Sequence, residues 1–311
     1  MWFSNAQIFQ YELTESSDLA TLLTDDALKP CPPHARFIYG WLPIIGENLV
    51  QDVAGCSLIC MGKEERILPR GVINRFLAER IQAMETQQGR SIKRAEKAQL
   101  AEELEFELLP KSFCLQKRLP AILDQVTQRL IVNSASSSQA AQLTSLLRKS
   151  LPGIRIEPLQ PMENLASMFA HWITNPASLP PNLQLASDCL LISPDDEKKR
   201  VNCKGYELPA DEILTLLSQG LVAAEISVIW NERIQLTLTH DLTLKRLKCL
   251  DYLVDEFNDV HQLEEEQQQK DAALALMAGE LRGLTNDILN ALSREKSSVN
   301  VEPTVEEAVP F

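Results

Sequence analysis

The sequence predicts an α+β fold, in which an antiparallel, strand-rich body carries a protruding helical-hairpin arm and C-terminal helices. Three observations lead to this prediction. Short strand-like segments bounded by turn residues recur through residues 1–68 and 119–250, two helical periodicities fill residues 69–118, and residues 251–292 have a helical pattern. With 311 residues and 45% hydrophobic content, the chain is long enough to bury a core in one large or two ordinary domains.

Residues 1–68 form the N-terminal part of the body. Trp41 stands beside glycine and proline and is expected to be a core anchor. The charged residues 63–66 are expected to connect the last strand to the arm. The expected elements are a strand, a short helix, a stiff extended link and an apolar strand, at Gln7–Leu13, residues 18–28, residues 29–33 and residues 57–61.

Residues 69–118 form what we call the arm. Apolar residues recur with helical spacing over residues 72–84, and Pro69 suits a position just inside a helix start. Gly89 weakens this helix, and a second helical run continues until Pro110 stops it. The arm is therefore predicted to be two consecutive helices.

Residues 119–250 complete the body, with a charged turn at residues 194–199 and a tight turn at Asn231-Glu232. Expected strands are residues 121–125, 129–133, 154–159, 183–193, 200–203, 221–230, 233–239 and 244–248. Expected helices are residues 136–151, 162–174 and 209–219.

The end of the chain is acidic. Residues 251–311 hold 14 acidic and 4 basic residues. Residues 251–292 are expected to form C-terminal helices. Residues 293–311 are polar and contain proline, so they are predicted to be a disordered acidic tail.

Charge is distributed unevenly. The chain carries a net charge of −13, yet residues 63–118 hold 12 basic against 9 acidic residues. An acidic protein that gathers its basic residues in this way is expected to reserve one surface for an anion, and its overall charge argues against indiscriminate adhesion to polyanions.

Three basic clusters make up the predicted binding surface. Like charges four residues apart on a helix repel, so the arm cluster favours an anionic partner, with a solvated helix face as the alternative for this cluster taken alone. At helical spacing its four members share an arc of about 100°. The clusters are Arg90, Lys93, Arg94 and Lys97 in the arm, then Lys198, Lys199, Arg200 and Lys204, and finally Lys245, Arg246 and Lys248.

The clusters predict contact with phosphates rather than with bases. No series of aromatic residues alternates with the charges, and no helix-turn-helix or zinc module is present. Nucleic-acid binding through phosphate contacts, without readout of the bases, fits this composition.

Other function classes find little support. The seven cysteines lack CxxC spacing, which favours reduced thiols and a cytoplasmic protein. There is no run of 18 apolar residues and no signal-peptide pattern, so no membrane association is expected. The sequence contains no Walker loop, GxGxxG, GxSxG or HExxH motif, so we expect no enzyme activity, no cofactor and no metal.

Two alternatives stay open. Asp188 and Glu197, with Lys199 completing a (D/E)xK pattern, fit a weak metal-dependent nuclease signature. The second alternative is a protein-interaction module whose basic arm binds an acidic partner.

The residues also resemble a known family, the bacterial recombination-associated protein RdgC family. The matching pieces occur in order over residues 2–292. They are Trp2-Phe3, Gly40-Trp41-Leu42-Pro43, Lys63-Glu64-Glu65-Arg66-Ile67-Leu68-Pro69, Leu108-Leu109-Pro110-Lys111-Ser112-Phe113, Leu146-Leu147-Arg148-Lys149-Ser150-Leu151, Met162-Glu163-Asn164, Arg233-Ile234-Gln235, Leu244-Lys245-Arg246-Leu247-Lys248 and Gly279-Glu280-Leu281.

This resemblance implies a ring-shaped homodimer that encircles duplex DNA, associates with the nucleoid and restrains RecA recombinase. It also implies that Phe113 matches the aromatic residue at the fingertip that joins the subunits. From the residues alone, the alternative is that Phe113 packs on Leu108 and Leu109. Lys204 matches a basic position near the DNA channel, although Gly205 and Tyr206 stand where the family more often has Lys and Gln.

Overall fold

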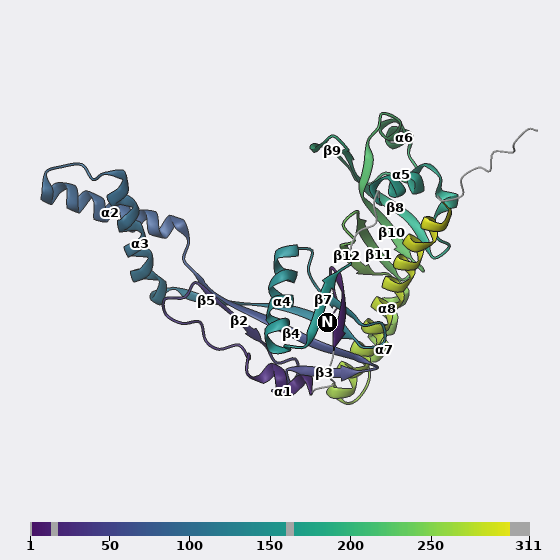
Figure 1. The fold of residues 1–311 in the computed structure, drawn as a ribbon, viewed down its shortest axis with the longest axis horizontal. Helices are drawn as coiled ribbons and strands as arrows, with labels where there is room; N and C mark the ends of the chain where they lie inside the picture. Colours follow the sequence, from purple (N-terminus) through teal and green to yellow (C-terminus); the bar gives the residue numbers. More distant parts are fainter. Residues whose placement is uncertain (1, 14–17, 160–164, 299–311) are drawn as a thin grey trace, which may run out of the picture.

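The chain folds as two antiparallel sheets joined by a long C-terminal helix, with a pair of helices extending from one side (Figure 1). The computed structural model describes residues 2–13, 18–159 and 165–298. Within these ranges the predicted α+β class is confirmed. None of the helices there is both long enough and apolar enough to cross a bilayer.

The first sheet has the strand order β2-β4-β5-β6-β1-β7, and β3 also pairs with β4. Trp41 is a core anchor as expected, since it is 1% exposed and donates a hydrogen bond to Ser150 Oγ at 2.8 Å. A Cβ on the preceding Gly40 would lie 2.4 Å from the Cα of Leu28, so this position requires glycine. The bounds are Gln7–Leu13 (β1), Phe37–Trp41 (β2), Val50–Val53 (β3), Cys56–Ile67 (β4), Phe113–Asp124 (β5), Arg129–Val132 (β6) and Ile154–Pro158 (β7).

β4 and β5 form a ribbon that leads from the body into the arm. They pair without a break from Cys56 opposite Asp124 to Ile67 opposite Phe113. The interpretation of residues 63–66 as a connection is therefore wrong, because they are the outer part of β4. Outside the core both faces of a ribbon accept polar side chains, so the apolar pattern that marks the inner part of β4 is missing.

Two helices make up the outer part of the arm (Figure 1). α2 spans Arg70–Gln88 and ends at Gly89, whose φ of 64° is left-handed. α3 spans Arg94–Leu108 and buries Leu104. The short helix η1, Leu109–Lys111, returns the chain to β5.

The second sheet has the strand order β12-β11-β10-β8-β9. Residues 196–199 were expected in a turn but belong to β9, an edge strand whose side chains need not alternate in polarity. The tight turn at Asn231-Glu232 has positive φ at both residues, and Arg233 follows them before the strands pair again at Trp230 and Ile234. The bounds are Leu183–Ser193 (β8), Asp196–Cys203 (β9), Val222–Trp230 (β10), Ile234–Thr239 (β11) and Leu244–Cys249 (β12).

The first sheet has an apolar core on each face. One core packs under α1 and α4 and contains Trp41, Leu143 and Leu147. The other lies between the two sheets and includes Ile122 from the first and Ile226 from the second. The helices of the body are Leu19–Thr24 (α1), Ser137–Ser150 (α4), Leu165–Thr174 (α5), Pro176–Ser178 (η2), Asp211–Ser218 (α6), Asp251–Val260 (α7) and Glu266–Ser298 (α8).

α8 packs closely against the second sheet where Gly283 meets Trp230. A Cβ on Gly283 would lie 3.1 Å from the ring of Trp230, so glycine lets the indole reach the helix backbone. Trp230 Nε1 donates to the Asp287 carboxylate at 2.9 Å. One turn away, Arg233 pairs with Glu280 of α8.

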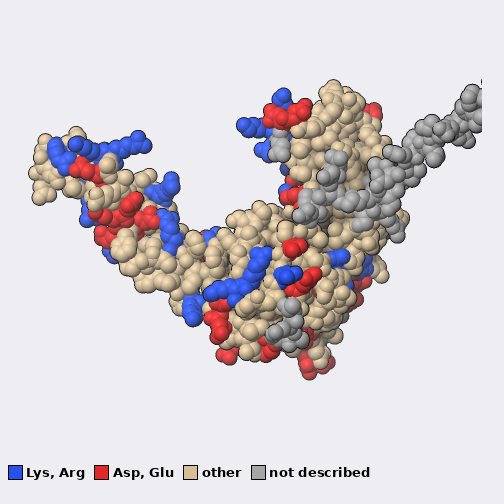
Figure 2. Space-filling view, viewed as in Figure 1, with Lys and Arg blue, Asp and Glu red and all other residues tan. Residues whose placement is uncertain are grey.

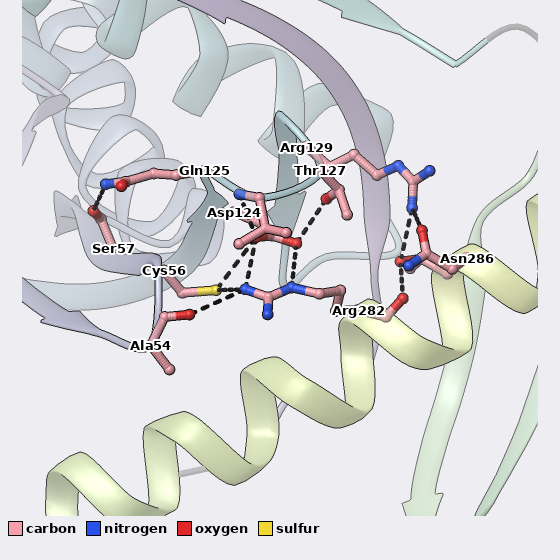
Figure 3. A network of polar contacts seen from close by, with 11 residues as sticks. Ala54, Cys56, Ser57, Asp124, Gln125, Thr127, Arg129, Arg282 and Asn286 are labelled. Carbon is pink, nitrogen blue, oxygen red and sulfur yellow. Dashed lines mark hydrogen bonds and ion pairs between the residues drawn. The ribbon is translucent and has the colours of Figure 1, made fainter. Parts of the chain in front are cut away.

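α8 contacts the first sheet through a buried ion pair (Figure 3). Arg282 Nε and Nη2 donate to the two carboxylate oxygens of Asp124 at 2.9 and 2.8 Å. Val126 N and Thr127 Oγ1 also donate to this carboxylate. Burial raises the pKa of Asp124, but the hydrogen bonds, that from Arg282 foremost, outweigh burial and hold the pKa below its usual value. One helix thus fixes both sheets.

Some expectations fall at or beyond the limits of the described residues. α5 begins at Leu165, and the first residues of the helix expected at 162–174 lie outside the described part. α8 includes residues 293–298, where the tail was expected to begin. The rest of the predicted tail, residues 299–311, lies outside the described residues.

Candidate nucleic-acid interface

The basic cluster of the arm lies at the turn between α2 and α3. Lys93 is the N-cap of α3, and Arg94 and Lys97 lie in its first turns, with all three residues exposed. Arg90 precedes the helix, so its assignment to the same helical arc is wrong. Its guanidinium instead donates to Glu96 at 2.9 and 2.7 Å.

The charges at this turn are not explained by helix stability. Cations at a helix N-terminus face the positive end of the helix dipole, which is unfavourable. Glu96 is the one acidic residue in the first turn, and hydrogen bonds from Arg90 and from the Lys93 backbone lower its pKa to about 2. Arg90 is thus already paired, and Lys93, Arg94 and Lys97 remain the cations that favour an external anion.

The two other basic clusters meet on the second sheet. A groove of about 500 Å³ lies on the face of this sheet that is turned away from the core. Arg200 and Lys204 enter it from the β9 side, and Arg246 enters it from β12, more than 40 residues along the chain. Glu225 of β10 lies between them. Pairing of strands therefore joins clusters that the sequence keeps apart.

The remaining predicted cations lie on β9 and β12 and are not among the residues that line this groove. Lys198 and Lys199 are exposed on β9, towards the free end of the hairpin. Lys248 is exposed on β12, opposite Gln235, whereas Lys245 is half-buried and pairs with Glu225. Arg246 and Lys248 lie on the same face of the sheet, because Lys248 is opposite Gln235 and Arg246 Nε donates to Thr237, two residues further along β11.

Figure 2 shows how these surfaces are arranged. Lysine and arginine side chains gather at the outer end of the arm and again around the end of β9. The two groups face an open region between the arm and the second sheet, which we call the hollow. The face seen in Figure 2 thus carries positive charge on both sides of one concave space.

Arg66 links the base of the arm to the body. Arg66 of β4 donates to the backbone carbonyls of Cys31 at 3.0 Å and Pro32 at 3.2 Å. On the arm side it donates to the carbonyls of Leu109, Pro110 and Ser112 at 3.3–3.4 Å. A planar guanidinium is suited to bridging several carbonyls at once, so Arg66 fixes the direction in which the arm leaves the body.

An apolar face lies beside this joint. Phe113 is 86% exposed, which excludes the alternative that it packs on Leu108 and Leu109. It lies on the first position of β5, opposite Ile67, and not on a turn. Ile67 and Leu115 on the same face are also exposed. Exposed apolar side chains that cluster in this way are typical of protein contacts.

The nuclease alternative has a poor geometric basis. Asp188 Oδ1 accepts a hydrogen bond from Gly205 N at 3.0 Å, and the side chain of Glu197 lies outside the described residues. Among the described side chains, no group of three or more His, Cys, Asp or Glu residues is placed to hold a metal ion. All seven cysteines are free thiols.

Comparison with known proteins identifies the family. A family model described as "Putative exonuclease, RdgC" matches residues 1–295. The chain belongs to the RdgC family. It is 32% identical over 303 residues to the recombination-associated protein RdgC of Psychromonas ingrahamii, covering 96% of this chain and 100% of that protein. It is 33% identical over 304 residues to the protein of the same name from Actinobacillus succinogenes, covering 95% and 99%.

Membership in the RdgC family links the chain to recombination, in agreement with the expected resemblance. The sequence missed two features of the site. Arg66 lies in the stretch from Lys63 to Pro69 that resembles the RdgC family, which could have drawn attention to it. Its role could not be predicted, because the carbonyls that it binds are distant in the sequence. Glu225 carried no signal, because an acidic residue in an isolated strand gives no hint of its cationic neighbours.

Proposed function

We propose that this RdgC-family chain binds DNA without sequence preference and acts as a ring-shaped homodimer around duplex DNA. The observation that carries the proposal is the position of the basic clusters on both sides of the hollow, in a chain whose net charge is −13. A polyanion inside the hollow meets cations from the arm and from the second sheet, while the acidic remainder discourages binding elsewhere.

The contacts are expected to involve phosphates. The exposed groups are Lys and Arg side chains, which neutralise phosphates in any sequence, and they lie on a helix start and on sheet edges rather than on a helix shaped for a groove. Single-stranded DNA offers the same phosphates and is expected to bind more weakly through the same cations.

Closure requires a second copy. One chain leaves the hollow open on one side (Figure 2). The apolar face at Phe113 and Ile67 is exposed at the base of the arm, where contact with the same face of another chain would bury it. Such a self-complementary contact is what two-fold symmetry produces, and a second contact elsewhere on the body then completes a ring.

The relatives are named recombination-associated proteins, which supports a role for this binding in recombination. A protein that occupies duplex DNA through its phosphates denies that DNA to a RecA-type recombinase, so restraint of RecA follows from occupancy and needs no direct contact between the two proteins. Association with the nucleoid follows from the same binding.

The test is a gel-shift series with duplexes of unrelated sequence across a range of salt concentrations. Each phosphate neutralised contributes about −0.9 to the slope of log K against log salt, so a dimer using several of these cations should show a slope on the order of −5 or steeper. A slope near zero or a strong preference for one sequence contradicts the proposal. A slope near zero together with retention by an acidic protein favours the protein-interaction module.

We also propose that the protein binds DNA without cutting it. The family model's description mentions an exonuclease, so the point needs its own experiment. Linear duplex incubated with purified protein and Mg²⁺ or Mn²⁺ should keep its length. Shortening of the DNA that disappears when Glu197 is replaced by alanine would favour the nuclease instead.

A further inference from the structure

Glu225 occupies the middle of the groove on the second sheet. Its side chain is 21% exposed and accepts a hydrogen bond from Lys245 Nζ at 2.8 Å. Its other oxygen lies 3.6 Å from Nη2 of Arg246. Two of the seven cations predicted for this sheet therefore already have a carboxylate partner inside the protein.

The backbone of β12 is distorted to bring these cations together. Arg246 has a φ of +55°, a left-handed conformation that is unfavourable for a residue with a side chain. It lies where the register between β11 and β12 shifts. In a regular strand Lys245 and Arg246 would point to opposite faces, whereas this bulge directs both to the face of Glu225.

The bulge is fixed by further hydrogen bonds. The Arg246 backbone N–H donates to Asn5 Oδ1 at 3.2 Å, and Arg246 Nε donates to Thr237 Oγ1 at 3.1 Å. The Arg246 side chain is nevertheless 57% exposed, so it remains open to the groove. A partly exposed ion pair adds little net stability, and it does not account for a left-handed arginine. The arrangement therefore needs an explanation other than stability.

We infer that Glu225 limits phosphate binding in this groove by competing with phosphate for Lys245 and Arg246. The inference rests on the proposed function. A DNA phosphate that enters the groove meets Arg200 and Lys204, which have no carboxylate within the groove at ion-pair distance among the described contacts. To reach the other two cations it must take the place of Glu225 as their acceptor and lie close to a like charge.

This competition has a consequence for the ring. A site that holds each phosphate weakly lets one phosphate leave as the next one enters, so the protein can move along the duplex. Retention on DNA then comes from encirclement, and the groove supplies orientation rather than tight binding. Without the Glu225 carboxylate, Lys245 and Arg246 could bind the backbone together with Arg200 and Lys204. Asp188 also lines the groove, but its described contact is with the Gly205 backbone N–H and not with a cation.

The experiment compares Glu225→Gln with Glu157→Gln. Glutamine keeps the size of the side chain and an oxygen acceptor but removes the charge. Glu157 is exposed on β7 in the first sheet, so its replacement changes the net charge equally without touching the groove. Gel shifts with short linear duplex measure the affinity and its salt dependence for both variants and for the wild type.

We expect Glu225→Gln to bind duplex on the order of tenfold more tightly, with a slope of log K against log salt that is steeper by about 1–2 for each chain. Glu157→Gln should remain within about twofold of the wild type, since its distance from the groove leaves it screened by salt. Equal affinity of the two variants, or weaker binding by Glu225→Gln, overturns the inference while the proposed function stands. Failure of the wild type to bind DNA at all overturns both.

A second comparison keeps the inference testable if Glu225→Gln is unstable. The pair Lys245→Gln and Arg246→Gln removes the cations that Glu225 already occupies, and the pair Arg200→Gln and Lys204→Gln removes the unoccupied ones. The second pair should weaken duplex binding several-fold more than the first. Equal losses, or a larger loss from the first pair, contradict a competing role for Glu225.

Discussion

Replacing Arg282 by methionine tests how α8 holds the first sheet. The substitution keeps the long apolar stem but removes both hydrogen bonds to Asp124, which is 1% exposed. The carboxylate keeps the donors Val126 N and Thr127 Oγ1 but loses its only partner of opposite charge among the described ion pairs. Asp124 then remains a buried anion without an ion-pair partner among the described contacts.

The structure sets the size of the effect. Removing one partner of a buried ion pair costs about 3–5 kcal/mol. The Arg282 side chain is 24% exposed, so water can partly solvate the Asp124 carboxylate once the guanidinium is removed. We therefore expect the free energy of unfolding to fall by about 3 kcal/mol, at the lower end of this range. Arg75→Met is the matched control, because Arg75 forms an exposed pair with Glu79 one helical turn away. Such pairs contribute about 0.3–0.5 kcal/mol.

Urea unfolding followed by far-ultraviolet circular dichroism and by tryptophan fluorescence measures both variants, with coincidence of the two signals as the check on a single transition. The pH dependence gives a second test. The lowered pKa of Asp124 means that its ionised form stabilises the folded chain above about pH 4, and that this contribution is lost as pH falls through the lowered pKa.

Without Arg282, burial dominates and raises the pKa of Asp124. The carboxyl group is then protonated as the pH falls, which removes the buried charge that destabilises the variant. The difference in unfolding free energy between wild type and Arg282→Met should therefore shrink between pH 7 and pH 4. A loss at pH 7 no larger than that of Arg75→Met, or a difference that grows towards pH 4, refutes the role of the ion pair.

Three further predictions concern DNA. Replacing Lys93, Arg94 and Lys97 by glutamine should make the slope of log K against log salt less steep by about 2–3 for each chain, without lowering the unfolding free energy. An unchanged slope in gel shifts would show that the arm does not contact DNA. Phe113→Ser should leave the unfolding free energy within about 0.5 kcal/mol of the wild type, because the ring is already exposed. It should weaken self-association in sedimentation velocity. Unfolding of this variant at a clearly lower urea concentration would show a structural role for Phe113 instead. Asp188→Ala should bind duplex like the wild type, and loss of binding in the same gel shifts would show that this carboxylate organises the groove.

Much of the fold was legible in the sequence where periodicity is strong. The helices of the arm follow from their apolar spacing and from the stops at Gly89 and Pro110. β8, β10 and β11 follow from apolar strands around tight turns. The outer part of β4 and the first half of β9 were missed for one reason: both lie away from the apolar cores, where hydrogen bonds to neighbouring strands stabilise them, so no apolar pattern marks them.

The candidate site was only partly predictable. The sequence located the basic residues, since charge is read directly. It did not show that Arg246 shares a groove with Arg200, because this depends on the order of strands in the second sheet. It misplaced Arg90, because helical spacing was continued through a turn. It did not show that Glu225 pairs with Lys245 and Arg246, because no sequence pattern marks the bulge at Arg246.

Encirclement of DNA is the central claim, and topological retention tests it most directly. The protein is loaded at low salt onto a closed-circular plasmid and onto the same plasmid cut once, and both are then challenged with high salt, which removes phosphate contacts equally from the two forms. The account predicts that protein remains on the closed circle and is lost from the linear molecule, because a ring leaves only over an end. Equal loss from both forms would contradict encirclement and leave only surface binding.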